Sequence, residues 1–188
     1  LRLVGSEMCI RDRIDTKKCV DCGLCTKVCP RENDNDMSKP KWWYQGWADS
    51  EIREHASSGG AASAIIRAFI KHGGYVASCL FDSGKFVFEV TNEMAVARKF
   101  AGSKYVKSNP EKIYGKIQSL LKANQKVLFI GLPCQVAAVN QFIKDKTNLV
   151  TADLICHGTP SPYLLKKCLQ EYGLSLIHIS EPTRRSYI

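Results

Sequence analysis

Four cysteines near the start of the chain have the spacing of a metal centre. The thiols belong to Cys19, Cys22, Cys25 and Cys29, and Pro30 follows the last of them. In this Cys-x-x-Cys-x-x-Cys-x-x-x-Cys-Pro pattern, three closely spaced thiolates bind one 4Fe-4S cluster while the chain turns tightly around it. Gly23 permits the turn between ligands, because glycine adopts backbone angles that other residues avoid. The spacing therefore predicts an iron-sulfur centre.

A zinc site is the alternative for the same four thiols. Two Cys-x-x-Cys pairs can form a tetrahedral zinc site, but the pairs of zinc modules are usually separated by many more residues. In two-cluster ferredoxins, the fourth cysteine of each run binds the other cluster. Cys29 is then expected to serve a second cluster whose own cysteine run lies upstream. We therefore expect two clusters in the intact protein and half of a ferredoxin-type module in residues 14–31.

Both ends of the chain are expected to be foreign to the protein. Residues 4–13 and 176–186 resemble translated read-through of sequencing adaptors. Such segments are excluded from reasoning about the fold, so we set aside residues 1–13 and 175–188. The upstream cysteine run and the natural carboxyl end are then expected to lie outside this sequence.

Composition and charge exclude several classes of protein. The 188 residues are 45% hydrophobic and 24% charged, which is ordinary for a globular protein. No apolar run reaches the eighteen or so residues of a membrane span, and no secretory signal begins the chain, so we expect a cytoplasmic protein. The formal charge of +9 is scattered along the sequence. A nucleic-acid partner is therefore not expected, whereas an acidic redox partner is compatible with this charge.

Alternating patterns from residue 51 onward predict an α/β domain with a mostly parallel sheet. A helix is expected over 60–72, because its apolar residues have helical spacing and Gly73-Gly74 ends it. Another helix should open at Asn109-Pro110-Glu111, where a capping residue precedes a proline and an acid. The expected strands are 75–81 and 85–91, joined by a hairpin turn, then 126–130 and 148–156, joined by a helix over 136–143.

The last two strand patterns predict where ligand chemistry gathers. Strand 126–130 runs into Gly131-Leu132-Pro133-Cys134-Gln135, and strand 148–156 ends in Cys156-His157-Gly158. If the strands are parallel, Cys134 and Cys156 lie at the same carboxyl edge, where open α/β sheets bind ligands. A helix start favours the thiolate of Cys134, but a small buried hydrophobe is an equal alternative. Cys156 and His157 suit proton transfer or metal binding, although a histidine at a strand end more often bonds to backbone.

Two loops of small residues suit a phosphate group and an aromatic ring. Ser57-Ser58-Gly59-Gly60 precedes a helix, whose positive dipole end favours an anion. Gly102-Ser103-Lys104-Tyr105 adds a cation and a ring. By themselves, these loops favour the simpler interpretation of an ordinary helix cap with flexible glycines and a surface turn.

Residues 32–50 form a polar linker that carries a cluster of aromatic residues. Trp42, Trp43, Tyr44 and Trp47 lie within six positions. We expect these rings to pack on the following domain, and stacking on a cofactor is the alternative. Cys79 and Cys168 fall within apolar patterns and are assigned to the core.

Taken together, five motifs that follow the cysteine run resemble those of the coenzyme F-420 hydrogenase/dehydrogenase beta-subunit family. The motifs are Glu51-Ile52-Arg53, Ser57-Ser58-Gly59-Gly60, Gly102-Ser103-Lys104-Tyr105-Val106, Gly131-Leu132-Pro133-Cys134-Gln135 and Asp153-Leu154-Ile155-Cys156-His157-Gly158. The resemblance covers residues 14–173. Leu132 departs from the family, which often has a small polar residue there. The family also continues where this domain, residues 51–174, stops.

The resemblance implies a ferredoxin-like module that feeds electrons to a flavin-binding α/β domain. The flavin, expected to be FAD, would pass hydride to or from the deazaflavin coenzyme F-420 or another small-molecule acceptor or donor. Cys134, Cys156 and His157 become candidates for roles beside the cofactor. The implied flavin-site residues are Ser57, Ser58, Gly59, Gly60, Gly102, Ser103, Lys104, Tyr105, Gly131, Pro133 and Gln135.

The resulting hypothesis is an iron-sulfur flavoprotein oxidoreductase that works with a redox partner protein or subunit. One alternative is a non-catalytic electron-transfer or interaction subunit of a larger redox or polysaccharide-biosynthesis system. Another is a zinc-stabilised binding module, which predicts colourless protein without acid-labile sulfide.

Overall fold

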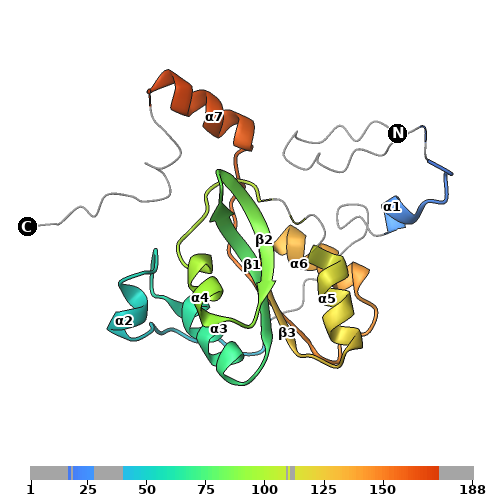
Figure 1. Ribbon diagram of the computed structural model, residues 1–188, viewed down its shortest axis with the longest axis horizontal. Helices are drawn as coiled ribbons and strands as arrows, with labels where there is room; N and C mark the ends of the chain where they lie inside the picture. Colours follow the sequence, from blue (N-terminus) through green and yellow to red (C-terminus); the bar gives the residue numbers. More distant parts are fainter. Residues whose placement is uncertain (1–16, 18, 28–39, 109, 111–112, 174–188) are drawn as a thin grey trace, which may run out of the picture.

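A four-stranded sheet organises the α/β part of the chain (Figure 1). The computed structural model describes residues 17, 19–27, 40–108, 110 and 113–173, except for the side chains of residues 24 and 25. The strand order is β2-β1-β3-β4. The strands are β1 Tyr75–Asp82, β2 Lys85–Thr91, β3 Val127–Gly131 and β4 Leu149–Asp153.

The first two strands form the expected hairpin. They pair antiparallel from Val76 opposite Thr91 to Asp82 opposite Lys85. Ser83 and Gly84 make the turn, with φ of 48° and 78°. Two consecutive residues with positive φ give a turn whose twist matches that of the flanking strands.

The other two pairings are parallel, as the alternating patterns predicted. β1 pairs with β3 from Tyr75 opposite Val127, and β3 pairs with β4 from Val127 opposite Leu149. A helix, α6, joins β3 to β4, as expected for a parallel crossover. The sheet is therefore mostly parallel, with one antiparallel edge strand.

Helices cover both faces of the sheet, with α3 and α4 on one side and α5 and α6 on the other (Figure 1). α3 confirms the helix expected over 60–72, and α5 confirms the helix expected after Pro110. The helices are α1 Leu24–Lys27, α2 Ser50–Arg53, α3 Ala61–Lys71, α4 Met94–Ala97, the 3-10 helix η2 Arg98–Phe100, α5 Ile113–Lys122, α6 Pro133–Phe142 and α7 Pro162–Glu171.

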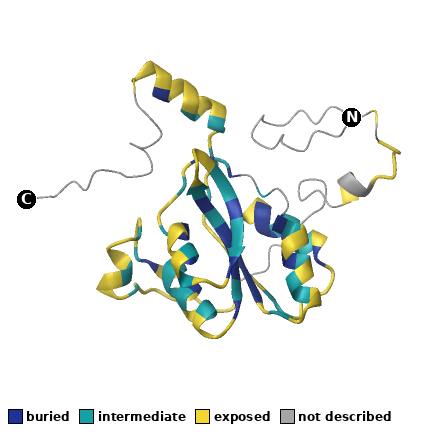
Figure 2. Ribbon diagram, viewed as in Figure 1, coloured by how far each residue is buried: buried dark blue, intermediate teal, exposed yellow. Residues whose placement is uncertain are grey.

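The central strand β3 supplies the core on both sides. All five of its residues are buried. Val127 and Phe129 face α5 and α6, whereas Leu128 and Ile130 face α3 and η2. Successive side chains of a strand point to opposite faces, so one short strand holds two hydrophobic layers together. Figure 2 shows buried residues concentrated in these strands and in the helix faces that cover them.

The aromatic linker does not pack as the sequence predicted. Trp42, Trp43, Tyr44 and Trp47 are 72% to 90% exposed. Helices already cover both faces of the sheet, so its core is formed without these rings. The segment instead meets the domain through its backbone, because the amide of Ala48 donates to the carbonyl of Gly59 at 2.8 Å.

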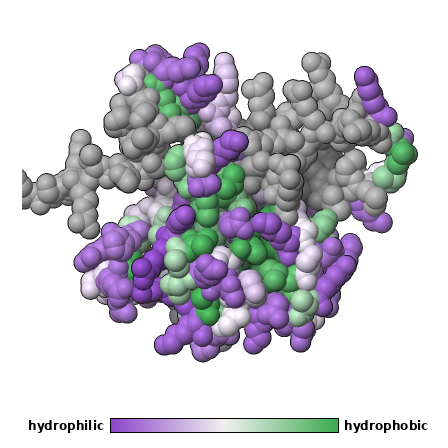
Figure 3. All heavy atoms as spheres, in the orientation of Figure 1, coloured by the Kyte–Doolittle hydropathy of each residue, from purple (hydrophilic) through white to green (hydrophobic). Residues whose placement is uncertain are grey.

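Cys79 and Cys168, the two cysteines assigned to the core, differ in their burial. Cys79 is half-buried and packs against the core. The prediction for Cys168 is wrong, because this residue is exposed on α7. Leu169 is the one buried residue of that helix, and Figure 3 shows mostly hydrophilic side chains over it. Among the described residues, no helix is long and apolar enough to cross a membrane.

Candidate functional site

Two of the predicted loops meet in space. The backbone amide of Ser103 donates to the hydroxyl of Ser57 at 2.7 Å, across 46 positions of sequence. Gly102 has a φ of +79°, which favours glycine, and a Cβ there would lie 3.8 Å from the same hydroxyl. The structure therefore joins the loop 57–60 to the loop 102–105.

The first of these loops leads directly into α3. Gly60 caps this helix with a φ of 78°, and no side chain caps its N-terminus. A Cβ at Gly60 would lie 3.1 Å from the Cβ of Ala48 and 3.2 Å from the Cγ2 of Ile52, so glycine also allows the close approach of the linker. The first amides of a helix point outward and attract anions. This arrangement suits a phosphate group.

Lys104 binds its own loop. Its Nζ donates to the carbonyl oxygens of four consecutive residues, 99–102, at distances of 3.2, 2.7, 2.6 and 3.0 Å. Burial lowers the pKa of Lys104 to about 8, and the electrostatic interaction with Cys79 acts in the opposite direction. The ammonium therefore holds the backbone that presents Gly102 and Ser103.

A buried hydrogen bond connects the second loop region to the start of α6. The Nε2 of Gln135 donates to the hydroxyl of Ser108 at 3.0 Å, and both residues are buried. The Oε1 of Gln135 accepts from the amide of Leu132 at 2.9 Å, which satisfies a free amide at the helix start. Ser108 was missed by the sequence analysis, because a serine after a turn carries no pattern of its own.

Cys79 lies between these two connections. Burial raises the pKa of the Cys79 thiol, whereas a hydrogen bond with Ser108 and the charge of Lys104 act in the opposite direction. A half-buried thiol of raised pKa is a poor nucleophile. Cys79 therefore has a packing role at the edge of the core, close to Ser108 and Lys104.

The carboxyl edge of the sheet carries the other candidates. The amide of Leu154 donates to the carbonyl of Gly131 at 2.9 Å, so β3 and β4 end side by side. Cys134 lies in the first turn of α6 and is exposed. Cys156 is half-buried, its sulfur accepts from the amide of Gly158 at 3.2 Å, and His157 is exposed. The topology confirms that β3 and β4 are parallel neighbours, but the expected strand 148–156 is shorter, because β4 ends at Asp153 and Cys156 lies in the loop after it.

The cysteine run is described in part. Cys19 and Cys22 are exposed, Cys25 lies on α1, and Cys29 is outside the described residues. The amide of Asp21 donates to the sulfur of Cys19 at 3.4 Å, and Gly23 has a φ of 68°. Amide bonds to sulfur and a glycine turn between ligands fit an iron-sulfur cluster. Within the described side chains, no three potential ligands gather at one point.

Two family models match separate parts of the chain. A 4Fe-4S dicluster domain matches residues 11–73. The C terminus of the coenzyme F420 hydrogenase/dehydrogenase beta subunit matches residues 124–182. The chain thus has an iron-sulfur dicluster region followed by the region in which the edge motifs lie.

Two individual proteins are similar to this chain over 70% of its length. An uncharacterized protein of Methanocaldococcus jannaschii is 27% identical over 141 residues, which cover 70% of this chain and 39% of that protein. A chain of the F420-reducing [NiFe] hydrogenase complex from Methanosarcina barkeri has the same fold, with a TM-score of 0.58, 20% identity, and coverage of 70% of this chain and 49% of that one. This chain therefore spans less than half of the length of either relative. Along the chain, the two family models match in the order iron-sulfur dicluster domain, then C terminus of the coenzyme F420 hydrogenase/dehydrogenase beta subunit.

Proposed function

We propose that this chain is the electron-relay and flavin-binding part of an oxidoreductase. One observation carries the flavin half of the proposal: a single short hydrogen bond, from Ser103 to Ser57, joins two loops that are 46 residues apart in sequence. Loops of small residues at a helix start are where proteins commonly hold the phosphates of a nucleotide cofactor.

The cysteine run would hold the iron-sulfur centre. Its ligands would be Cys19, Cys22 and Cys25, with Cys29 serving a second cluster in the intact protein, and residues 14–31 would form this half-module. A cluster supplies one-electron transfer, whereas a flavin supplies the exchange between single electrons and hydride. The contribution of the chain is to place these groups and to tune them.

The α/β domain, residues 51–174, would hold the flavin, which we expect to be FAD. Ser57, Ser58, Gly59 and Gly60 would bind phosphate at the start of α3, where the helix dipole favours an anion. Lys104 would act indirectly, because its hydrogen bonds to the carbonyl oxygens of residues 99–102 hold the loop in place. The ring of Tyr105 is 75% exposed and so is accessible for stacking on a flat group.

The carboxyl edge would lie beside the reacting part of the cofactor. Gly131, Pro133 and Gln135 shape the start of α6, and the buried bond from Gln135 to Ser108 fixes this turn relative to the strand end. Cys134, Cys156 and His157 are proposed to act near the cofactor, in proton transfer or electron relay. The acceptor or donor of hydride would be coenzyme F-420 or another small molecule, and a redox protein or subunit of the cytoplasm would exchange electrons with the cluster.

A flavin titration tests the proposal. Replacement of Ser57 by alanine removes the acceptor of the Ser103 amide, so we expect FAD affinity to fall by about tenfold, the effect of one lost hydrogen bond to a charged or positioned group. The control is Ser119→Ala, because this exposed hydroxyl bonds only to its own helix, at Gly115. Quenching of FAD fluorescence measures the FAD affinity of both variants. Absence of FAD binding to the unsubstituted chain would overturn the flavin half of the proposal.

A non-catalytic electron-transfer subunit is the second candidate. The four exposed aromatic residues between positions 42 and 47 favour it, because exposed tryptophan and tyrosine are enriched where proteins dock. This candidate predicts a reducible cluster, no bound flavin, and no reduction of coenzyme F-420 by the chain with its electron donor. Stoichiometric FAD together with a reducible acceptor would reject it.

A further inference from the structure

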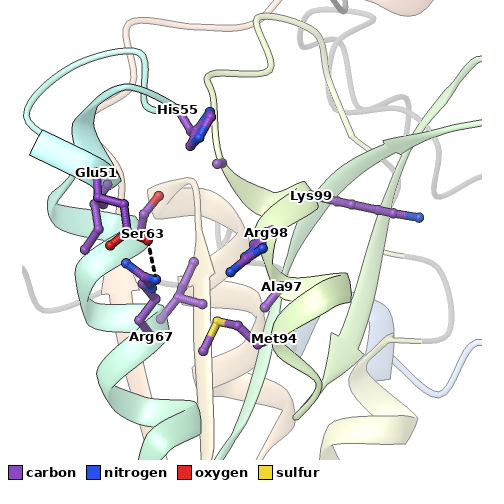
Figure 4. A pocket seen from close by; sticks show the side chains of 11 residues that line it. Glu51, His55, Ser63, Arg67, Met94, Ala97, Arg98 and Lys99 are labelled. Atoms are coloured by element: carbon purple, nitrogen blue, oxygen red, sulfur yellow. Dashed lines mark hydrogen bonds and ion pairs between the residues drawn. The ribbon is translucent and has the colours of Figure 1, made fainter.

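A cavity of about 530 Å³ lies beside the paired loops, between α2, α3 and α4 (Figure 4). It borders the loop 102–105 through Ala101 and the first turn of α3 through Ser63. Of the five motifs that carry the family resemblance, Glu51-Ile52-Arg53 alone contributes residues to the lining of this cavity. Its volume falls in the range of small-molecule sites.

Three cationic residues, Arg67, Arg98 and Lys99, belong to the lining of this cavity. Arg67 comes from α3 and Arg98 from η2, and their guanidinium groups approach the cavity from opposite sides (Figure 4). Glu51 is the one carboxylate of the lining, and its Oε1 lies 2.9 Å from the Nη2 of Arg67. The guanidinium of Arg98 makes no ion pair with the described residues. The lining therefore retains positive charge after this pair is counted.

The pair between Glu51 and Arg67 is easily replaced. The Glu51 side chain is 74% exposed and that of Arg67 is 36% exposed, and such surface pairs contribute roughly 0–1 kcal/mol. A phosphate group offers three oxygens, and arginine binds it through two parallel hydrogen bonds. An anion between Arg67 and Arg98 would thus gain more than the carboxylate loses.

Apolar side chains form the rest of the lining. Ile66 of α3 is a buried residue of the lining, and Met94 and Ala97 line the side formed by α4. Small-molecule sites combine such a surface with a few polar groups that fix orientation. The cavity therefore offers an anion site and an apolar surface next to each other.

We propose that this cavity binds the phosphate group of a small molecule, with Arg67 and Arg98 as its ligands and Glu51 as the group it displaces. The phosphate has two possible sources, which are the flavin itself and a separate phosphorylated substrate. The site follows from the cavity and its charges and does not depend on flavin binding.

Binding of inorganic pyrophosphate to the full chain, measured by calorimetry at low salt, tests the site. Arg98→Gln should weaken binding about tenfold, because it removes one charged donor pair. Glu51→Gln should strengthen binding about threefold, because Arg67 loses its competing carboxylate, and a misfolded variant cannot produce such a gain. Lys99→Gln is the matched control, since Lys99 also lines the cavity and carries the same charge, but its side chain points away from the other labelled side chains (Figure 4).

The outcomes separate the site from the proposed function. Unchanged affinity in Arg98→Gln, or an equal loss in Lys99→Gln, would overturn the site. If pyrophosphate competes with FAD, the phosphate belongs to the flavin; if it binds to FAD-loaded protein with the same affinity, it belongs to a separate substrate. Arginine-dependent pyrophosphate binding without any FAD binding would keep the site and reject the flavin proposal.

Discussion

The cysteine segment and the α/β domain of this chain rely on different sources of order. Among the described residues, the buried hydrophobic ones all lie between Ile66 and Leu169, whereas every residue from 17 to 47 with a described burial is exposed. Burial of apolar surface stabilises the domain, whereas in the cysteine segment all residues of described burial, 17, 19–23, 26 and 27, are exposed. Bonds between thiolates and a metal centre are then the remaining source of order for that segment. The two regions should therefore respond to different substitutions.

Removal of a ligand should have the largest effect on the cysteine segment. We expect Cys22→Ser to lose most of the iron and acid-labile sulfide bound by the anaerobically reconstituted chain, relative to the unsubstituted chain. The free energy of unfolding of the domain should change by less than about 0.5 kcal/mol, because Cys22 is exposed. Metal analysis and urea denaturation measure the two effects.

Cys168→Ser is the matched control for this ligand substitution, because Cys168 is also exposed but lies on α7. It should keep the iron. An equal loss of iron in both variants would show that the segment is not the cluster site.

Removal of core packing should destabilise the domain without loss of iron from the cysteine segment. Phe129 is fully buried and stacks on Phe88 with ring centroids 5.3 Å apart. Phe129→Ala should lower the free energy of unfolding by about 3–5 kcal/mol, through lost burial and a residual cavity. Iron bound per chain should stay unchanged at temperatures where the variant is folded. The control is Tyr163→Ala, at a residue that is 77% exposed, which should lower the free energy of unfolding by less than about 0.5 kcal/mol. Loss of iron in Phe129→Ala would mean that the two regions fold as one unit.

The buried link between the loops should have an intermediate effect. Ser108→Ala leaves the Nε2 of Gln135 without its partner, at an expected cost of about 1–3 kcal/mol in the free energy of unfolding. Ser119→Ala removes an exposed hydroxyl and should change it by less than about 0.5 kcal/mol. Urea denaturation compares the two. Equal costs would show that the buried bond adds nothing beyond the loss of a hydroxyl.

The smallest effect concerns thiol reactivity within the domain. Burial raises the pKa of Cys79, so less of its reactive thiolate is present at pH 8 than at an exposed cysteine. We expect a maleimide to modify Cys168 at least about tenfold faster than Cys79, as followed by peptide mass spectrometry. Comparable rates would mean that the core opens readily around β1.

The parallel part of the fold was predictable because its signals are local and agree with each other. Glycines bracket α3, and the turn at Ser83 and Gly84 lies between two strand patterns. The strands that end near Gly131 and Asp153 place their motifs on one edge by topology alone. The meeting of the loops at Ser57 and Ser103 was not predictable, because their contact depends on how α3 packs on the sheet.

The errors have a common physical origin. Aromatic residues such as Trp43 and the apolar pattern around Cys168 were expected to be buried, yet burial needs a second surface that the sequence pattern does not specify. The arginine cavity was missed for a related reason. Its walls include α2 and α4, helices of four residues that are too short to show a hydrophobic period.

The hydrogen bonds of Lys104 to four carbonyl oxygens affect which ionic conditions the loop 99–104 tolerates, compared with the cysteine segment. Rings of backbone oxygens in proteins often hold a dissolved cation, and such a loop loses its shape when that cation is removed. Here the cation is attached to the chain, so its local concentration is set by a covalent tether and not by the solution. Chelators and dialysis should therefore leave the loop 99–104 intact while they remove the iron of the cluster proposed for the cysteine segment. An apoprotein prepared in this way would retain a preformed loop beside Ser57.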